Sequence, residues 1–215
     1  AGEYFGSKFT YAETFKMFED YKKAFIALDG KNESPITISA PSTISSVNAM
    51  YGALDANKII NMTGPGFLLS YTDKYTKEIG SKTVVIFDSF LNEEFINRLN
   101  KAGVKNVIIA SVTDYMNPAV KQYAIANGAI SGVDFLDAYS KEHKLPLDMQ
   151  FIRISEFAET GAKIAETVDF PYEENKIAAY FLTPFSSTYS PLMYALFTEI
   201  LSSYFFIAST TTFAA

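Results

Sequence analysis

The sequence predicts an α/β fold in which a mostly parallel sheet is flanked by helices on both faces. The first observation is a set of short apolar runs, which we expect to form strands near 36–39, 58–62, 83–87, 107–111 and 176–182. The second is that these runs alternate with stretches of helical periodicity and turn signals. Strands of a parallel sheet are buried on both faces, so they lack the polar alternation of half-exposed strands.

The first thirty residues predict a short strand followed by a long helix. Residues 4–9 are expected to form a strand or one arm of a hairpin. Thr10 is a suitable N-cap for a helix from Tyr11 to about Asp29, because its hydroxyl can accept a bond from a free backbone N–H. Glu13 follows three residues later and completes a capping box with Thr10.

The chain then alternates between strands and helices as far as residue 127 and is less regular beyond it. We expect helices over residues 44–54, 67–79, 92–101, 118–127, 133–144 and 149–157. Strands that alternate with helices of this length indicate βαβ units, whose crossovers place helices on both faces of a parallel sheet.

Composition excludes several classes of function. The net charge of −6 and the lack of a Lys/Arg cluster argue against a nucleic-acid surface. The absence of cysteine excludes disulfides, thiolate metal sites and a cysteine nucleophile. The single histidine, His143, lies in a charged helix end, where we expect a solvated side chain rather than a catalytic one.

The C-terminal stretch differs from the rest of the chain. Residues 184–215 contain no Lys or Arg and one acid, Glu199. The apolar run Tyr194–Ala208 is shorter than the roughly 20 residues of a membrane span, so no transmembrane segment is expected. The chain starts at Ala1 without a signal-peptide pattern, and we expect a cytoplasmic fragment of a larger protein.

The sequence from Lys176 to Pro191 organises our interpretation of function. Residues 176–183 form an apolar, aromatic run that ends on Thr183, as expected of a buried strand that leads into a loop. Residues 184–191 are rich in hydroxyl side chains but contain no glycine and no cation. A phosphate cradle needs backbone N–H groups that approach the anion closely, so these residues alone favour a Ser/Thr turn.

Four local patterns, in this order, resemble the N-terminal subdomain of the AMP-forming acyl-CoA synthetase and adenylation-domain family. The resemblance covers residues 1 to about 183, and its patterns are Phe9-Thr-Tyr-Ala-Glu13, the block from Ile38 to Leu54, Ile59-Ile-Asn-Met62 with Gly64-Pro65, and the segment from Val107 to Pro118. The resemblance implies an acetyl-CoA synthetase-like α/β subdomain over residues 1–183. Residues 184–215 would then be partial segments of the following subdomain.

The resemblance also implies a two-step reaction. A small carboxylic acid attacks the α-phosphate of ATP, with Mg²⁺ bound, to give an acyl-adenylate and pyrophosphate, and the thiol of CoA then displaces AMP. In the family a Gly-rich loop closed by a lysine follows a strand of this kind, which assigns Thr183, Ser186, Ser187 and Thr188 to the ATP phosphates. The family's other motifs have no counterpart, so no catalytic or metal-ligating residue is assigned, and the isolated chain is expected to be inactive.

Three alternatives remain open from the sequence. An amino-acid adenylation domain shares all four patterns, and a non-catalytic α/β binding module would keep the fold without the phosphate loop. A dehydrogenase is disfavoured because no G-x-G-x-x-G motif follows a predicted strand. The abrupt change in composition after Thr183 suggests that residues of a loop are missing from the printed sequence. We therefore predict one or more chain breaks between Thr183 and Ala215.

Overall fold

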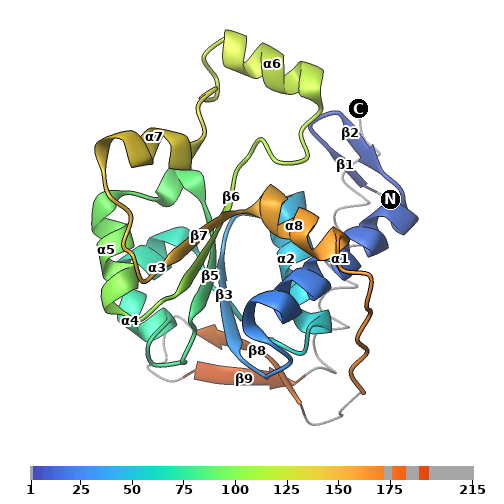
Figure 1. Cartoon of the computed structure of the whole chain (residues 1–215), viewed down its shortest axis with the longest axis vertical. Coiled ribbons are helices and arrows are strands. Elements are labelled where there is room, and N and C mark those ends of the chain that lie inside the picture. The colour runs from blue at the N-terminus through green and yellow to red at the C-terminus, as the bar shows by residue number, and fades with distance from the viewer. Residues whose placement is uncertain (1, 172–175, 183–188, 194–215) are drawn as a thin grey trace.

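The computed structural model describes residues 2–171, 176–182 and 189–193, which form one large sheet, a hairpin and the helices around them (Figure 1). The sheet has seven strands in the order β7-β6-β5-β3-β4-β8-β9. Six strands are parallel to one another, and β9 (Tyr189–Met193) pairs antiparallel with β8 (Ile177–Leu182) at one edge. The predicted α/β fold with a mostly parallel sheet is therefore confirmed.

The five predicted strands all form, with ends shifted by one residue at most. They are β3 (Pro35–Ser39), β4 (Ile59–Met62), β5 (Thr83–Phe87), β6 (Asn106–Ala110) and β8. Side chains along β5 and β6 alternate between two buried apolar layers, whereas β3 has Ile36 and Ile38 on one face and the buried polar residues Thr37 and Ser39 on the other. Burial on both faces is the reason that these strands were readable as continuous apolar runs.

Helices cover the two faces separately. The first face is covered by α1 (Tyr11–Asp29), α2 (Ile44–Asp55) and α8 (Ile154–Ala162), whose side chains form one core with Ile36 and Ile38. The second face carries the other core, built around Phe95 and Leu99 of α5 (Glu93–Lys101). Two short helices, α3 (Pro65–Ser70) and α4 (Thr72–Tyr75), and α7 (Phe135–Glu142) contribute side chains to this second core.

The N-terminal prediction is confirmed in detail. β1 (Gly2–Tyr4) and β2 (Ser7–Phe9) pair antiparallel as a hairpin that turns at Phe5 and Gly6. The Thr10 hydroxyl accepts a hydrogen bond from the Glu13 amide, and the Glu13 carboxylate accepts one from the Thr10 amide at 2.8 Å. These two bonds form the predicted capping box at the start of α1.

Two of the predicted helices were wrong in part. Residues 149–157 form the short strand β7 (Gln150–Arg153) before α8 begins at Ile154, because pairing with β6 dominates over the local pattern. The helix predicted over residues 67–79 is instead the pair α3 and α4, interrupted at Tyr71. The hydroxyls of Thr72 and Thr76 donate to backbone carbonyls one turn earlier, which weakens a continuous helix.

The remaining helices follow the prediction more closely. The N-cap of α5 is Asn92, and α7 is two residues shorter at each end than the predicted helix over residues 133–144. The predicted helix over residues 118–127 is α6 (Pro118–Ala126), which lies apart from the sheet in Figure 1 and has no buried residue. Val120 and Tyr123 of α6 are exposed on its surface.

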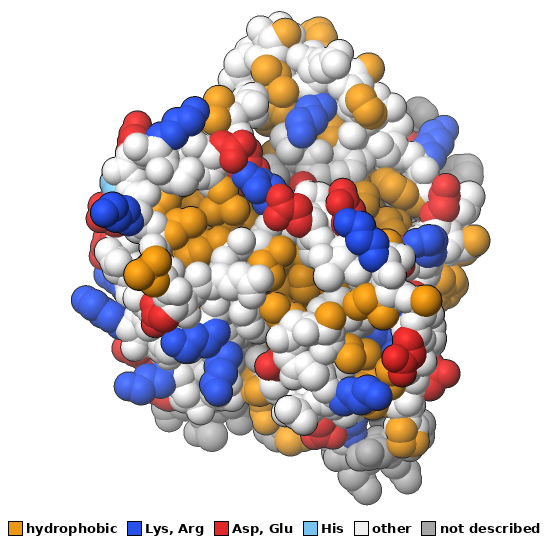
Figure 2. Space-filling view, viewed as in Figure 1, with side chains coloured by type: hydrophobic (Ala, Val, Ile, Leu, Met, Phe, Trp, Pro, Cys, Tyr) orange, Lys and Arg blue, Asp and Glu red, His pale blue; other side chains and the backbone are white. Residues whose placement is uncertain are grey.

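The visible surface mixes charges of both signs, and apolar side chains show on the lobe that α6 forms and between the charged groups below it (Figure 2). Among the described residues, no helix has the length and apolar character needed to cross a bilayer.

The backbone of α1 approaches α2 and α8 unusually closely, at two glycines. A Cβ atom added at Gly161 of α8 would lie 1.7 Å from the carbonyl oxygen of Asp20, and one at Gly52 of α2 would lie 2.3 Å from Tyr21 Cβ. Neither glycine has a positive φ, so steric contact with α1, and not backbone conformation, requires glycine at these positions.

We expect Gly161→Ala to destabilise the fold by about 1–3 kcal/mol, because the added methyl group must force α1 and α8 apart. In a helix without this contact the same change stabilises by about 0.5–1 kcal/mol. The matched control is Gly66→Ala in α3, where an added Cβ meets nothing within 4 Å. Urea unfolding of both variants tests this, and wild-type stability of the Gly161 variant would contradict the packing described.

Candidate functional site

The candidate site lies at the edge of the sheet where all six parallel strands end. The strand order reverses at β3, which has β4 on one side and β5 on the other. In open α/β sheets, ligands bind outside the carboxyl ends of the strands at such a reversal, because the adjacent crossovers diverge and leave a crevice. The segments that leave this point are residues 40–43, which lead into α2, and 88–92, which lead into α5.

The N-terminus of α2 is held firmly at this edge. Thr43 is its N-cap and forms a capping box with Ser46. The Ser46 hydroxyl also donates to the carbonyl of Pro41 at 2.6 Å, which ties the loop to the first turn of the helix. Ser45, the neighbouring residue, is buried, and its hydroxyl is directed to the loop that follows β6.

That loop contains Asp114, the most perturbed carboxyl group at this edge. One carboxylate oxygen of Asp114 accepts a hydrogen bond from the Ser111 amide at 2.6 Å and a longer one from the Ser45 hydroxyl at 3.4 Å. Burial raises the pKa of Asp114 to about 6, although both hydrogen bonds oppose this shift. The Asp88 carboxylate at the end of β5 raises the pKa further, and Lys121 lowers it.

Aromatic hydroxyl groups hold the other side of this loop. Tyr115 adopts a φ of 60°, which is uncommon for a residue with a side chain. Its hydroxyl shares a hydrogen bond of 3.1 Å with the hydroxyl of Tyr21 in α1, and the Tyr4 hydroxyl donates to the carbonyl of Val112 at 2.9 Å. The hairpin and α1 therefore hold the loop that positions Asp114.

The residues assigned from the sequence to ATP phosphates, Thr183, Ser186, Ser187 and Thr188, lie outside the described residues. The predicted chain break after Thr183 lies outside them as well. The strands on either side are described, and Leu182 of β8 pairs with Tyr189 of β9. Because Asn61 of β4 pairs with Tyr180, the end of β8 lies beside the end of β4, at the same edge as Asp114.

The arrangement offers hydrogen-bonding and acid–base chemistry. Asp114 can exchange a proton near neutral pH, with the hydroxyls of Ser45, Ser111 and Thr113 in the same loop cluster. No cluster of three or more His, Cys, Asp or Glu side chains suited to a metal ion occurs among the described residues. His143 belongs elsewhere: it stacks on Tyr139 in α7 and lies 3.7 Å from Glu93 of α5.

Asp114 was not singled out from the sequence. Its position directly after a predicted buried strand was a usable signal, because the carboxyl ends of parallel strands commonly carry functional residues. The Ser111 amide is a local partner, but Ser45 and Asp88 lie far away in the chain, and no local pattern reveals them.

The sequence itself matches no protein-family model, and no curated protein matches it significantly. The fold does have solved counterparts. The adenylation domain of a carboxylate reductase from Mycobacterium chelonae superposes with a TM-score of 0.60 at 12% identity, over 86% of this chain and 27% of that one. A carboxylic acid reductase domain from Segniliparus rugosus, in complex with AMP and a co-purified carboxylic acid, gives 0.59 at 11% identity, over 86% and 28%.

A long-chain-fatty-acid–CoA ligase from Archaeoglobus fulgidus gives a TM-score of 0.56 at 16% identity, over 90% of this chain and 32% of that one. The chain thus spans about a quarter to a third of the length of these structures. At these identities the likeness shows the fold, and it confirms the resemblance at that level.

The raised pKa of Asp114 predicts a specific pH dependence of stability. The folded state binds this proton up to about pH 6, whereas the unfolded chain releases it near pH 4, so the contribution of Asp114 to stability falls as pH rises across this interval. We expect Asp114→Asn, relative to wild type, to gain about 1–2 kcal/mol between pH 4 and pH 7, a value discounted for partial solvent exposure.

The matched control for this measurement is Asp134→Asn. Hydrogen bonds from Arg153 lower the pKa of Asp134, so the stabilising contribution of this carboxylate should be lost only as pH falls below about 4, and the difference from wild type should stay nearly constant between about pH 5 and pH 7. Urea titrations at several pH values measure both variants. A pH-independent difference for Asp114→Asn would show that this carboxyl group is not buried as described.

Proposed function

We propose that this chain is the N-terminal α/β part of an ATP-dependent, AMP-forming carboxylate–CoA ligase. The observation that carries the proposal is strand β8, which ends at Leu182 at the carboxyl edge beside β4, in a sheet with the fold of adenylation domains. This is the edge at which an α/β sheet binds nucleotides. In the Segniliparus rugosus structure the ligands are AMP and a carboxylic acid, which supports the substrate class.

The residues present fit the ATP phosphates only in part. Thr183, Ser186, Ser187 and Thr188 supply hydroxyl donors, but residues 184–191 contain neither a glycine for close backbone approach nor a cation. Described residues also lack a carboxylate cluster for Mg²⁺. We therefore derive no catalytic step for this chain and assign the completion of the ATP, Mg²⁺ and CoA sites to the remainder of a longer protein.

In this proposal, residues 1–215 form one wall of the adenylation site. The loop of Asp114 and the N-terminus of α2 lie at the same edge as the end of β8, so polar groups from these two segments would face a ligand bound there. Acyl transfer through an adenylate forms an anhydride between the acid and the α-phosphate of ATP and releases pyrophosphate. Substrate held against preformed hydrogen-bond donors reacts faster, because orientation is fixed before the chemical step.

A non-catalytic binding module with this fold is the second candidate. The observation that favours it is the composition of residues 184–191, whose hydroxyl side chains without glycine or lysine suit a Ser/Thr turn better than a phosphate loop. Such a module would keep the fold and lose the adenylation reaction.

Exchange of labelled pyrophosphate into ATP separates the two candidates. With a panel of carboxylic acids, residues 1–215 alone should give no exchange, because the donor set for ATP is incomplete. A protein that continues past Ala215 should exchange with at least one acid. Robust exchange by residues 1–215 would contradict the view that the piece is incomplete, and failure of the longer protein with every acid would favour the binding module.

A further inference from the structure

A second candidate site lies at the opposite edge of the sheet, where the parallel strands begin. A cavity of about 350 Å³ opens there between the C-terminal end of α2, the start of β4 and the start of β8, and residues 169–171 line its outer side. This volume lies within the range of small-molecule sites. Three lysines line the cavity: Lys22 of α1, and Lys58 and Lys176, which directly precede β4 and β8.

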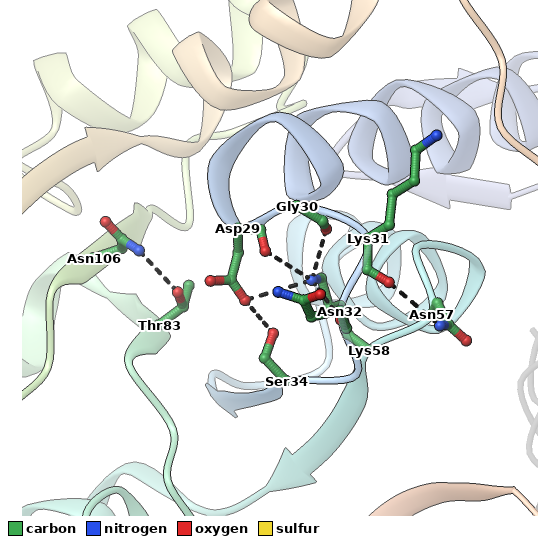
Figure 3. A network of polar contacts seen from close by, with 9 residues as sticks. All are labelled: Asp29, Gly30, Lys31, Asn32, Ser34, Asn57, Lys58, Thr83 and Asn106. Carbon is green, nitrogen blue, oxygen red and sulfur yellow. Dashed lines mark hydrogen bonds and ion pairs between the residues drawn. The ribbon is translucent and has the colours of Figure 1, made fainter.

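The ammonium group of Lys58 has close hydrogen-bond acceptors within the protein. Its side chain is fully buried, and its ammonium group donates to the carbonyls of Gly30 at 2.9 Å and Asn32 at 2.8 Å (Figure 3). The carboxylate of Asp29 lies 3.4 Å away and completes the shell. Lys58 therefore has no capacity left for a ligand.

Lys22 is nearly as buried but is held less tightly. Its side chain is 8% exposed, and its ammonium nitrogen lies 3.2 Å from the Asp169 carboxylate and 3.5 Å from that of Glu19. Charge-assisted hydrogen bonds are usually 2.7–2.9 Å long. The side chain of Asp169 is 90% exposed, so water screens most of its charge. A buried ammonium group with only long or screened partners is costly.

Lys176 repeats this pattern on the other side of the cavity. Its side chain is 15% exposed, and the nearest carboxylate among the described residues, that of Glu33, is 3.7 Å away, too far for a hydrogen bond. Two nearly buried cations thus line one cavity, and the closest carboxylates that the described residues offer them are Asp169 at 3.2 Å from Lys22 and Glu33 at 3.7 Å from Lys176. Between them the wall is apolar, formed by Leu54, Phe170 and Pro171.

We propose that this cavity binds a small organic anion, whose carboxylate lies between Lys22 and Lys176 and whose apolar body packs on Leu54 and Phe170. Three features oppose an anion, namely the carboxylates of Asp55 and Asp169 on the cavity wall and the C-terminal end of α2. Both lysines are therefore required. The site lies away from the carboxyl edge, so it is independent of the proposed ligase function.

The test uses residues 1–215 and benzoate as the probe, with ¹H–¹⁵N correlation spectra as readout. We expect saturable shifts with a Kd on the order of 1 mM, centred on the amides of Asn57 and Ala178, which line the cavity. Amides of the Asp114 loop should not shift. Benzamide, which has the same shape without the charge, should bind at least tenfold more weakly.

Variants decide between this site and non-specific binding. Lys176→Gln and Lys22→Gln should each weaken benzoate binding roughly tenfold, and Lys176→Gln serves if the Lys22 variant is unstable. Asp55→Asn should tighten it by about threefold, since a repelling charge is removed. Lys105→Gln, a half-exposed lysine paired with Asp148, is the matched control and should change nothing.

Three results would overturn the proposal. They are no shifts up to about 10 mM benzoate, equal binding of benzoate and benzamide, and equal binding by the wild type and both lysine variants.

Discussion

The contact of α1 with two glycines is the constraint on which the rest of the structure depends. Gly52 of α2 and Gly161 of α8 let the backbones of three helices touch over the first face of the sheet. With α1 fixed in this way, the Tyr21 hydroxyl meets Tyr115 at the carboxyl edge, and Lys22, the next residue, lines the cavity at the amino edge. One helix therefore positions groups at both ends of the sheet.

Elements whose stability is local or wholly apolar could be predicted from the sequence. The central strands were readable because both of their faces are buried, and the start of α1 was readable because its cap lies within four residues. β7 was missed because an edge strand that begins with Gln150 and ends with Arg153 has no continuous apolar run. β9 was missed because its order comes from pairing with β8, and Pro191 within it argues against a strand.

The candidate site was less accessible from the sequence than the fold. Thr183 and the following hydroxyl residues came from a family resemblance and remain a prediction, since they lie outside the described residues. The environment of Asp114 depends on Ser45 and Asp88, and that of Tyr115 on Tyr21, so it exists only after folding. The lysines of the amino-edge cavity likewise come together only after folding, because Lys22 and Lys176 are 154 positions apart in the chain.

At 11–16% identity the likeness to the solved structures shows the fold alone, because one fold can carry unrelated sites. The role of the 183–188 connection is tested most directly by the variant Ser186→Ala/Ser187→Ala/Thr188→Ala in a protein that continues past Ala215. If these hydroxyls hold ATP phosphates, the KM for ATP in pyrophosphate exchange should rise at least about tenfold, with the KM for the acid unchanged. An unchanged KM for ATP would contradict a nucleotide site at this end of β8.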